Sequence, residues 1–211
     1  MGGCIGIVYK PRTPDGGIEV YNNTFDGCGW MAVPAVEVGK DSFVKTFRNN
    51  VVFNFALGEK FGKGPAAMVR PSYFEESSTP LPERVGYADY NLFYNPKSKS
   101  KINYALGVAG KTLRRDAGFA LNDATKGGEV DQQVAPQFGG PLPTAFPFRD
   151  EDIKGGKVTV SQILALFRAA YTPAAGSPLI DAGDPADGEG ADIGAVGTGK
   201  PHKDDCFGRP R

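Results

Sequence analysis

Short apolar runs separated by glycine, proline and aspartate make up the first part of this chain, and no helical period interrupts them. Runs at residues 4–9, 18–21, 33–38, 43–47 and 51–55 have the length and alternation of β-strands. Strands of about five residues without intervening helices are typical of a parallel coil of stacked strands. An antiparallel sandwich would give similar local signals.

A phrase with central asparagines recurs and favours the parallel arrangement. Residues 20–25 read VYNNTF, residues 47–52 read FRNNVV 27 positions later, and residues 89–93 give a looser copy, DYNLF. Each copy is expected to form one short strand. The period is that of one coil in a stacked-strand solenoid, in which equivalent residues lie about 4.8 Å apart. The asparagines are therefore expected to hydrogen-bond along a ladder, the alternative being that they mark ordinary turns.

The organisation expected from this pattern is a single all-β unit. Coils occupy residues 1–95, with a long glycine- and proline-rich loop at 56–86. A loop-rich segment at 96–199 is expected to form the end cap of the same domain, and residues 200–211 a tail.

One short α-helix is expected between Thr159 and Tyr171, where apolar residues recur at helical spacing. Thr159 is the expected N-cap, with Ser161 as the competing position, and Pro173 stops the helix. We expect its apolar stripe to cover the core, the alternative being a groove for a partner.

Composition narrows the function classes. The 211 residues include 24 basic and 24 acidic residues, and this zero net charge argues against nucleic acid as a partner. The 29 glycines and 17 prolines together exceed a fifth of the chain, which indicates many turns. No apolar stretch is long enough to span a membrane, and the first residues do not read as a signal peptide.

The C-terminal motifs carry a family resemblance. Residues 176–185 (GSPLIDAGDP) and 191–195 (ADIGA) resemble the terminal phrases of secreted right-handed parallel β-helix proteins of the pectate-lyase-like superfamily. Residues 88–94 (ADYNLFY) and 134–138 (VAPQF) are similar to elements that precede those phrases. The resemblance extends from about Gly17 to Gly197 and implies a partial right-handed parallel β-helix of few coils. It also implies an extracellular or cell-surface location.

The function implied by the resemblance is that of an extracellular polysaccharide-binding or polysaccharide-degrading, lyase-like protein. Enzymatic activity stays open, because the superfamily includes lyases, glycoside hydrolases and proteins of unknown role. The alternative is a non-catalytic structural or adhesive module, or a truncated remnant. Because the chain begins inside a coil, we expect a C-terminal fragment. Its open strand edge would be covered by missing N-terminal coils or by self-association.

Basic and aromatic residues on or beside the coils supply the candidate site. A polysaccharide lyase needs a base and positive charge, and the candidates for catalysis are Lys45, Arg48 and Arg70. The candidates for carbohydrate binding are Tyr21, Trp30, Arg48 and Tyr73. In the repeat Arg48 aligns with Tyr21, so both are expected in one outward column. The alternative is that these are ordinary outward residues of a polar face.

A group of aspartates in the terminal motif has two interpretations. Their side chains are expected to bind turn amides, and the alternative is a calcium site built from Asp181, Asp184, Asp187 and Asp192. No other cofactor is indicated, since His202 is the only histidine and no nucleotide-binding motif is present.

Overall fold

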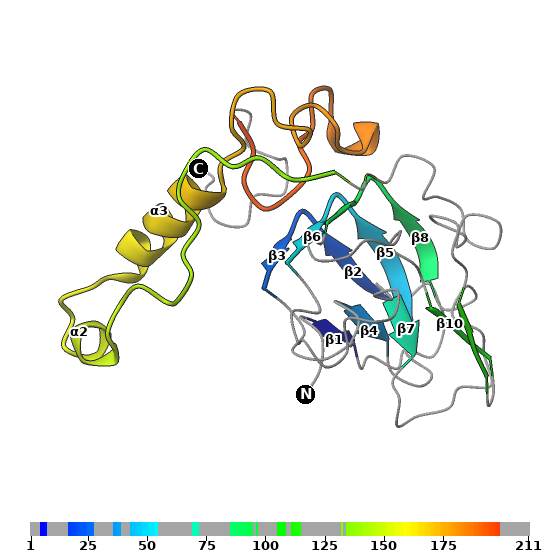
Figure 1. The fold of residues 1–211 in the computed structure, drawn as a ribbon, viewed down its shortest axis with the longest axis horizontal. Helices are drawn as coiled ribbons and strands as arrows, with labels where there is room; N and C mark the ends of the chain where they lie inside the picture. Colours follow the sequence, from blue (N-terminus) through cyan, green and yellow to red (C-terminus); the bar gives the residue numbers. More distant parts are fainter. Residues whose placement is uncertain are drawn as a thin grey trace.

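Three parallel sheets form the body of the molecule (Figure 1). The computed structural model describes residues 5–7, 17–27, 36–38, 43–54, 69–71, 85–94, 96, 105–108, 111–114, 132 and 134–198. Sheet A contains β1 (Ile5–Ile7), β4 (Val36–Val38) and β7 (Val69–Pro71). Sheet B contains β2 (Ile18–Tyr21), β5 (Val44–Arg48) and β8 (Val85–Asp89). Sheet C contains β3 (Thr24–Asp26), β6 (Val51–Phe53) and β9 (Leu92–Tyr94).

Successive strands enter sheets A, B and C in rotation. The body therefore has three layers, β1 to β3, β4 to β6 and β7 to β9, and every pairing between these layers is parallel. The expectation of parallel sheets is confirmed, and the antiparallel sandwich is wrong for these strands. A further antiparallel pair, β10 (Ala105–Val108) and β11 (Lys111–Arg114), follows the third layer.

The core lies between the sheets, where equivalent side chains stack from layer to layer. Two columns run through it: Val20, Phe47 and Ala88 in sheet B, and Phe25, Val52 and Phe93 in sheet C. The rings of Phe47 and Phe93 are nearly parallel, with centroids 6.5 Å apart. A register slip of one residue between layers would turn every side chain of a strand to the other face of the sheet. Stacking therefore requires the same pattern of inward and outward residues in each layer, and this requirement explains why the phrase recurs.

The corner between sheets B and C explains why asparagine recurs. Its first residue is Asn22, Asn49 or Tyr90 in the successive layers, with φ of 54°, 52° and 55°. Asparagine tolerates this left-handed conformation better than most residues with a side chain. The backbone turns here, so each copy of the phrase is two strands joined by a bend. The expectation of one strand per copy was wrong, because the pattern of polar residues does not report φ.

The second corner residue in each layer is an asparagine of the expected ladder, which is confirmed. Asn23 donates through Nδ2 to Oδ1 of Asn50 (3.0 Å), and Asn50 donates through Nδ2 to Oδ1 of Asn91 (3.0 Å). The backbone N–H groups of Asn23 and Asn50 donate to the same two oxygens. Asn50 and Asn91 are fully buried, so the ladder provides hydrogen-bond partners that water cannot.

The expected loop at residues 56–86 contains a strand. β7 lies inside it, and β8 begins at Val85. Pro71 hid this strand in the sequence, because proline lacks the N–H that a central strand requires. β7 is the last strand in the order of sheet A, where proline is tolerated. The rest of this range and the expected tail at 200–211 lie outside the described residues.

An arm built from two helices follows the third layer (Figure 1). It contains α2 (Asp150–Lys154), which the sequence analysis missed, and α3 (Val160–Tyr171), which it expected. Thr159 caps α3, and its capping box with Gln162 confirms the expected start. Within the described part of the chain, neither helix is long and apolar enough to cross a membrane.

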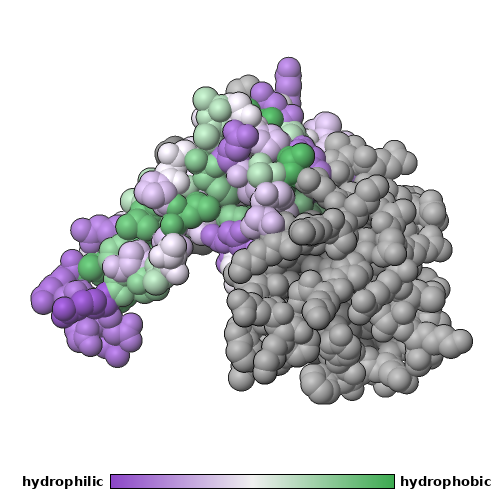
Figure 2. Space-filling model, in the orientation of Figure 1, coloured by the Kyte–Doolittle hydropathy of each residue, from purple (hydrophilic) through white to green (hydrophobic). Residues whose placement is uncertain are grey.

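The apolar stripe of α3 covers the body core, as expected, only at its C-terminal end, where Tyr171 packs against the core cluster that contains Phe53. The arm projects away from the sheets past β3, and apolar residues lie along its surface behind a polar tip (Figures 1 and 2). Val160 is 71% exposed, Leu164 and Leu166 are each 37% exposed, and only Ala170 of α3 is buried. Stacked rings of Phe146, Phe167 and Tyr171 hold the arm together. Periodicity indicates that a helix face is apolar without indicating what covers it.

The terminal segment, residues 175–198, returns along the corner between sheets B and C. Leu179 and Ile193 are fully buried in one cluster with Val51, Phe53 and Leu92. Ala195 N donates to Thr24 in the first layer, and Gly194 N donates to the carbonyl of Asn49 in the second. These contacts run along the stack, and closure of one end by this segment is not among the described contacts.

Candidate functional site

The outer face of sheet B brings together three of the candidate residues, Tyr21, Lys45 and Arg48. Its residues alternate with the buried core positions, and they are Glu19, Tyr21, Thr46, Arg48, Tyr87 and Asp89. The register places Arg48 opposite Tyr21, as the repeat predicted. This outer face has two parts: one is exposed around Lys45, and the other is covered by the terminal segment.

The exposed part is shaped by an irregularity in β5. The register pairs Ile18 with Val44 and Glu19 with Thr46, so Lys45 is an extra residue with no counterpart in β2. Such a bulge re-aims a side chain outward. The side chain of Lys45 is 52% exposed, and its Nζ lies 2.6 Å from a carboxylate oxygen of Glu19. The result is an exposed pair of opposite charges on the outer face of sheet B.

A glycine accommodates this bulge. The Cβ that any other residue would place at Gly86 would lie 2.8 Å from the carbonyl oxygen of Lys45. Gly86 therefore allows β8 to lie close to β5 at the bulge.

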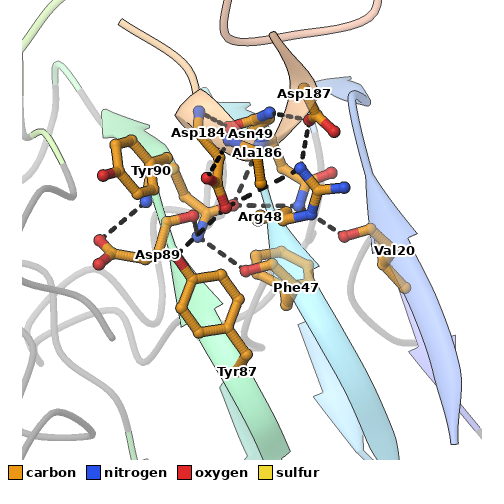
Figure 3. Close-up of polar contacts among 12 residues, drawn as sticks. Val20, Phe47, Arg48, Asn49, Tyr87, Asp89, Tyr90, Asp184, Ala186 and Asp187 are labelled. Carbon is orange, nitrogen blue, oxygen red and sulfur yellow. Dashed lines mark hydrogen bonds and ion pairs between the residues drawn. The ribbon is translucent and has the colours of Figure 1, made fainter. Parts of the chain in front are cut away.

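The covered part is an anchoring cluster, composed of Arg48, Asn49, Tyr87, Asp184 and Asp187 (Figure 3). The guanidinium of Arg48 donates to Asp187 and lies 5.2 Å from the centroid of the Tyr21 ring. Burial opposes the charge of Arg48, but its hydrogen bond to Asp187 and the charges of Asp187 and Asp184 raise its pKa above the usual value.

Asn49 joins the bend of the second layer to the terminal segment. Its Oδ1 accepts from the backbone N–H of Asp184 (2.7 Å), and its Nδ2 donates to Asp187 (2.5 Å). Its carbonyl accepts from Gly194 (2.9 Å). Asn49 is fully buried, so each of these groups depends on a protein partner.

Two tyrosines of the third layer face the carboxylates of this region. The hydroxyl of Tyr87 donates to Asp184 (3.2 Å). Burial, and then the negative charges of Asp184 and Asp89, raise the pKa of Tyr87 and of Tyr90. Both hydroxyls therefore keep their protons at neutral pH and can act as hydrogen-bond donors.

The aspartates of the terminal motif bind amides. Asp192 accepts from the N–H groups of Asp181 (2.8 Å) and Thr198 (2.6 Å), and Asp184 accepts from that of Ala186 (2.9 Å). The amide-binding interpretation is confirmed for Asp184 and Asp192. Among the described residues, no group of three or more acidic, histidine or cysteine side chains has an arrangement that could hold a metal ion.

Of the remaining candidates of the basic and aromatic group, the structure places only Arg70, which is not on this face. Arg70 lies in β7 of sheet A, opposite Glu37. Trp30 and Tyr73 lie outside the described residues. Sequence reasoning missed Asn49 as a link to the terminal segment and Asp187 as the partner of Arg48. The separation of 139 residues along the chain left no local signal for that pair.

Comparison of the chain with models of known families, with curated proteins and with solved structures found no match in any of the three.

Proposed function

We propose that the chain is the C-terminal part of a secreted right-handed parallel β-helix protein of the pectate-lyase-like kind, and that it binds polysaccharide. The support for the fold is the rotation of successive strands through three parallel sheets, with the asparagine ladder at one corner. The support from sequence is the terminal motif at residues 176–195. An extracellular location follows from the same resemblance.

The binding surface is the exposed part of the outer face of sheet B. The observation that carries this proposal is the bulge that presents Lys45 beside Glu19, with a separation of 2.6 Å. An ammonium group donates to sugar hydroxyls and uronate carboxylates, while a carboxylate accepts from hydroxyls. The strands lie side by side with a regular spacing of about 4.8 Å, and an extended glycan can lie across them.

Binding is favoured over cleavage because the carboxylates described on the outer face of sheet B and in the anchoring cluster already have protein partners. A glycosidase needs two carboxylates that face one bond. Glu19 is bonded to Lys45, while Asp184 and Asp187 hold the anchoring cluster together. A lyase needs a second cation near its base, and Arg48 is directed to Asp187.

The test is a binding assay with two glycans, an acidic uronate polymer and a neutral glucan. Wild-type protein is expected to bind the acidic polymer more tightly. Lys45→Ala is expected to weaken binding about tenfold, since one charge-assisted hydrogen bond is lost. Lys157→Ala is the matched control, because Lys157 is also exposed and paired with a carboxylate, but lies on the arm. Absence of binding to both glycans, or equal effects of the two variants, would contradict the proposal.

A non-catalytic structural module is the second candidate. The observation that favours it is the anchoring cluster, which uses Arg48 to hold the terminal segment rather than a ligand. This candidate gains support if neither glycan binds, and the release of unsaturated uronate products by purified protein would rule it out.

A further inference from the structure

The terminal segment covers part of the outer face of sheet B with a loop, residues 184–190. The base of this loop is fixed, because Gly183 N donates to the carbonyl of Ala191 (2.7 Å). Leu179 and Ile193, on either side of the base, are fully buried in the core. A displacement of the loop therefore concerns its tip, residues 185–190, and leaves the core intact.

The tip of the loop is held to the sheet by polar contacts. It contains a short 3-10 helix, η2 (Pro185–Asp187), in which no residue is buried, and its two apolar residues, Pro185 and Ala186, are exposed. Asp187 accepts from the guanidinium of Arg48 and from Nδ2 of Asn49 (Figure 3). Lifting the tip thus removes no apolar side chain from the core. Its cost is the loss of hydrogen bonds and an ion pair, which a ligand of the same chemistry can replace.

The groups that hold Asp187 form a carboxylate-binding set. One oxygen of Asp187 accepts from both the guanidinium of Arg48 and the amide of Asn49. The ring of Tyr21 lies against the same guanidinium, with 5.2 Å between Cζ and the ring centroid, and helps to fix its orientation. A guanidinium and an amide donate equally to a carboxylate of the chain and to a carboxylate of a bound uronate.

The bulge places this set on the same face as Lys45. Residues three apart on a regular strand point to opposite faces, but the extra residue in β5 brings both Lys45 and Arg48 to the outer face of sheet B. At a rise of about 3.3 Å per residue, their Cα atoms are about 10 Å apart. One extended acidic oligosaccharide can therefore reach both cations.

We propose that Arg48 and Asn49 form a second glycan subsite, which takes a uronate carboxylate, and that the tip of the loop covers it with Asp187 in the place of the ligand. The inference rests on the proposed function, because it extends the binding surface around Lys45 along the same face. An acidic glycan bound at Lys45 displaces the tip and brings a carboxylate to Arg48. The guanidinium then has an anionic partner in both states, which avoids the cost of a largely buried charge without one.

The first test removes the carboxylate that competes with the ligand. Asp187→Asn is expected to bind the acidic uronate polymer about tenfold more tightly than the wild type, because its uncovered state is more populated. Its affinity for the neutral glucan is expected to stay unchanged. Asp152→Asn is the matched control, since it also removes a carboxylate paired with basic side chains, but on the arm. No gain for Asp187→Asn, or an equal gain for both variants, overturns the proposal.

A monomeric uronate tests the subsite independently of the surface around Lys45. The probe is galacturonate, with galactose, which lacks the carboxylate, as its neutral counterpart. Galacturonate is expected to raise the urea midpoint of Asp187→Asn, and the wild type is expected to need about tenfold more of it for the same shift. Galactose is expected to shift neither midpoint. The urea transition itself shows that each protein is folded.

Two further variants assign the shift. Arg48→Ala in the Asp187→Asn background is expected to abolish the shift by galacturonate, whereas Lys45→Ala in the same background is expected to preserve it. A shift that survives Arg48→Ala, or no shift in either the wild type or Asp187→Asn, overturns the subsite. A retained galacturonate shift without polymer binding by the wild type would support the subsite and contradict the proposed function alone.

Discussion

The asparagine ladder makes a quantitative prediction about the middle layer. Asn50→Ala removes a fully buried side chain whose Oδ1 accepts from the backbone N–H and Nδ2 of Asn23 and whose Nδ2 donates to Val20 O and Asn91 Oδ1. The N–H of Asn23 and the carbonyl of Val20 lose their partners. Each buried polar group without a partner costs about 1–3 kcal/mol, so we expect the two groups together to lower the free energy of unfolding by about 2–6 kcal/mol.

The position of each asparagine in the stack sets its expected effect. Asn23 is only half-buried, and no described residue donates to its Oδ1, so Asn23→Ala should cost about 1 kcal/mol. The assay is urea unfolding followed by circular dichroism, with an unchanged dependence on urea as evidence that the native surface is preserved. Equal losses for Asn23→Ala and Asn50→Ala would refute the ladder as a cooperative, buried element.

Three further predictions concern contacts outside the ladder. Gly86→Ala should cost about 1–3 kcal/mol in urea unfolding, because the new Cβ meets the carbonyl of Lys45 at 2.8 Å. Asp187→Ala should cost about 3 kcal/mol by leaving a largely buried guanidinium without its partner. The double variant with Asp187→Ala and Arg48→Ala should lose less free energy of unfolding than the two single variants lose in sum. Strict additivity of these losses would show that the two side chains do not interact. Burial and a hydrogen bond to a carboxylate raise the pKa of Tyr171, so its contribution to stability is complete below pH 10 and is lost as pH rises through the folded pKa. Tyr171→Phe should therefore flatten the fall of unfolding free energy above pH 10, and an unchanged slope would contradict this.

Features that repeat locally could be predicted from the sequence. The asparagine phrase predicted the ladder, since neighbouring layers place Asn23, Asn50 and Asn91 directly over one another, but it did not predict the bend within each copy. The start of α3 was also predictable, because its capping box lies within four residues.

Features that depend on distant segments could not be predicted. The pairing of Arg48 with Asp187 follows from how the terminal segment returns along the stack, and no local pattern encodes that path. Two apolar residues of the terminal motif, Leu179 and Ile193, are buried, whereas Ile180 beside them is half-buried. Asp181, directly after Ile180, has a φ of 53°, and the spacing of apolar residues does not report such a turn.

A disulfide cross-link tests the stacked parallel register most directly. Glu19 and Thr46 are register partners in neighbouring layers, and both lie on the outer face of sheet B. In a background with the three native cysteines replaced by serine, Glu19→Cys with Thr46→Cys should form a disulfide within one chain on mild oxidation. Glu19→Cys with Arg48→Cys, shifted by two residues, should not. Cross-linking of the shifted pair in preference to the register pair would contradict the layered parallel structure.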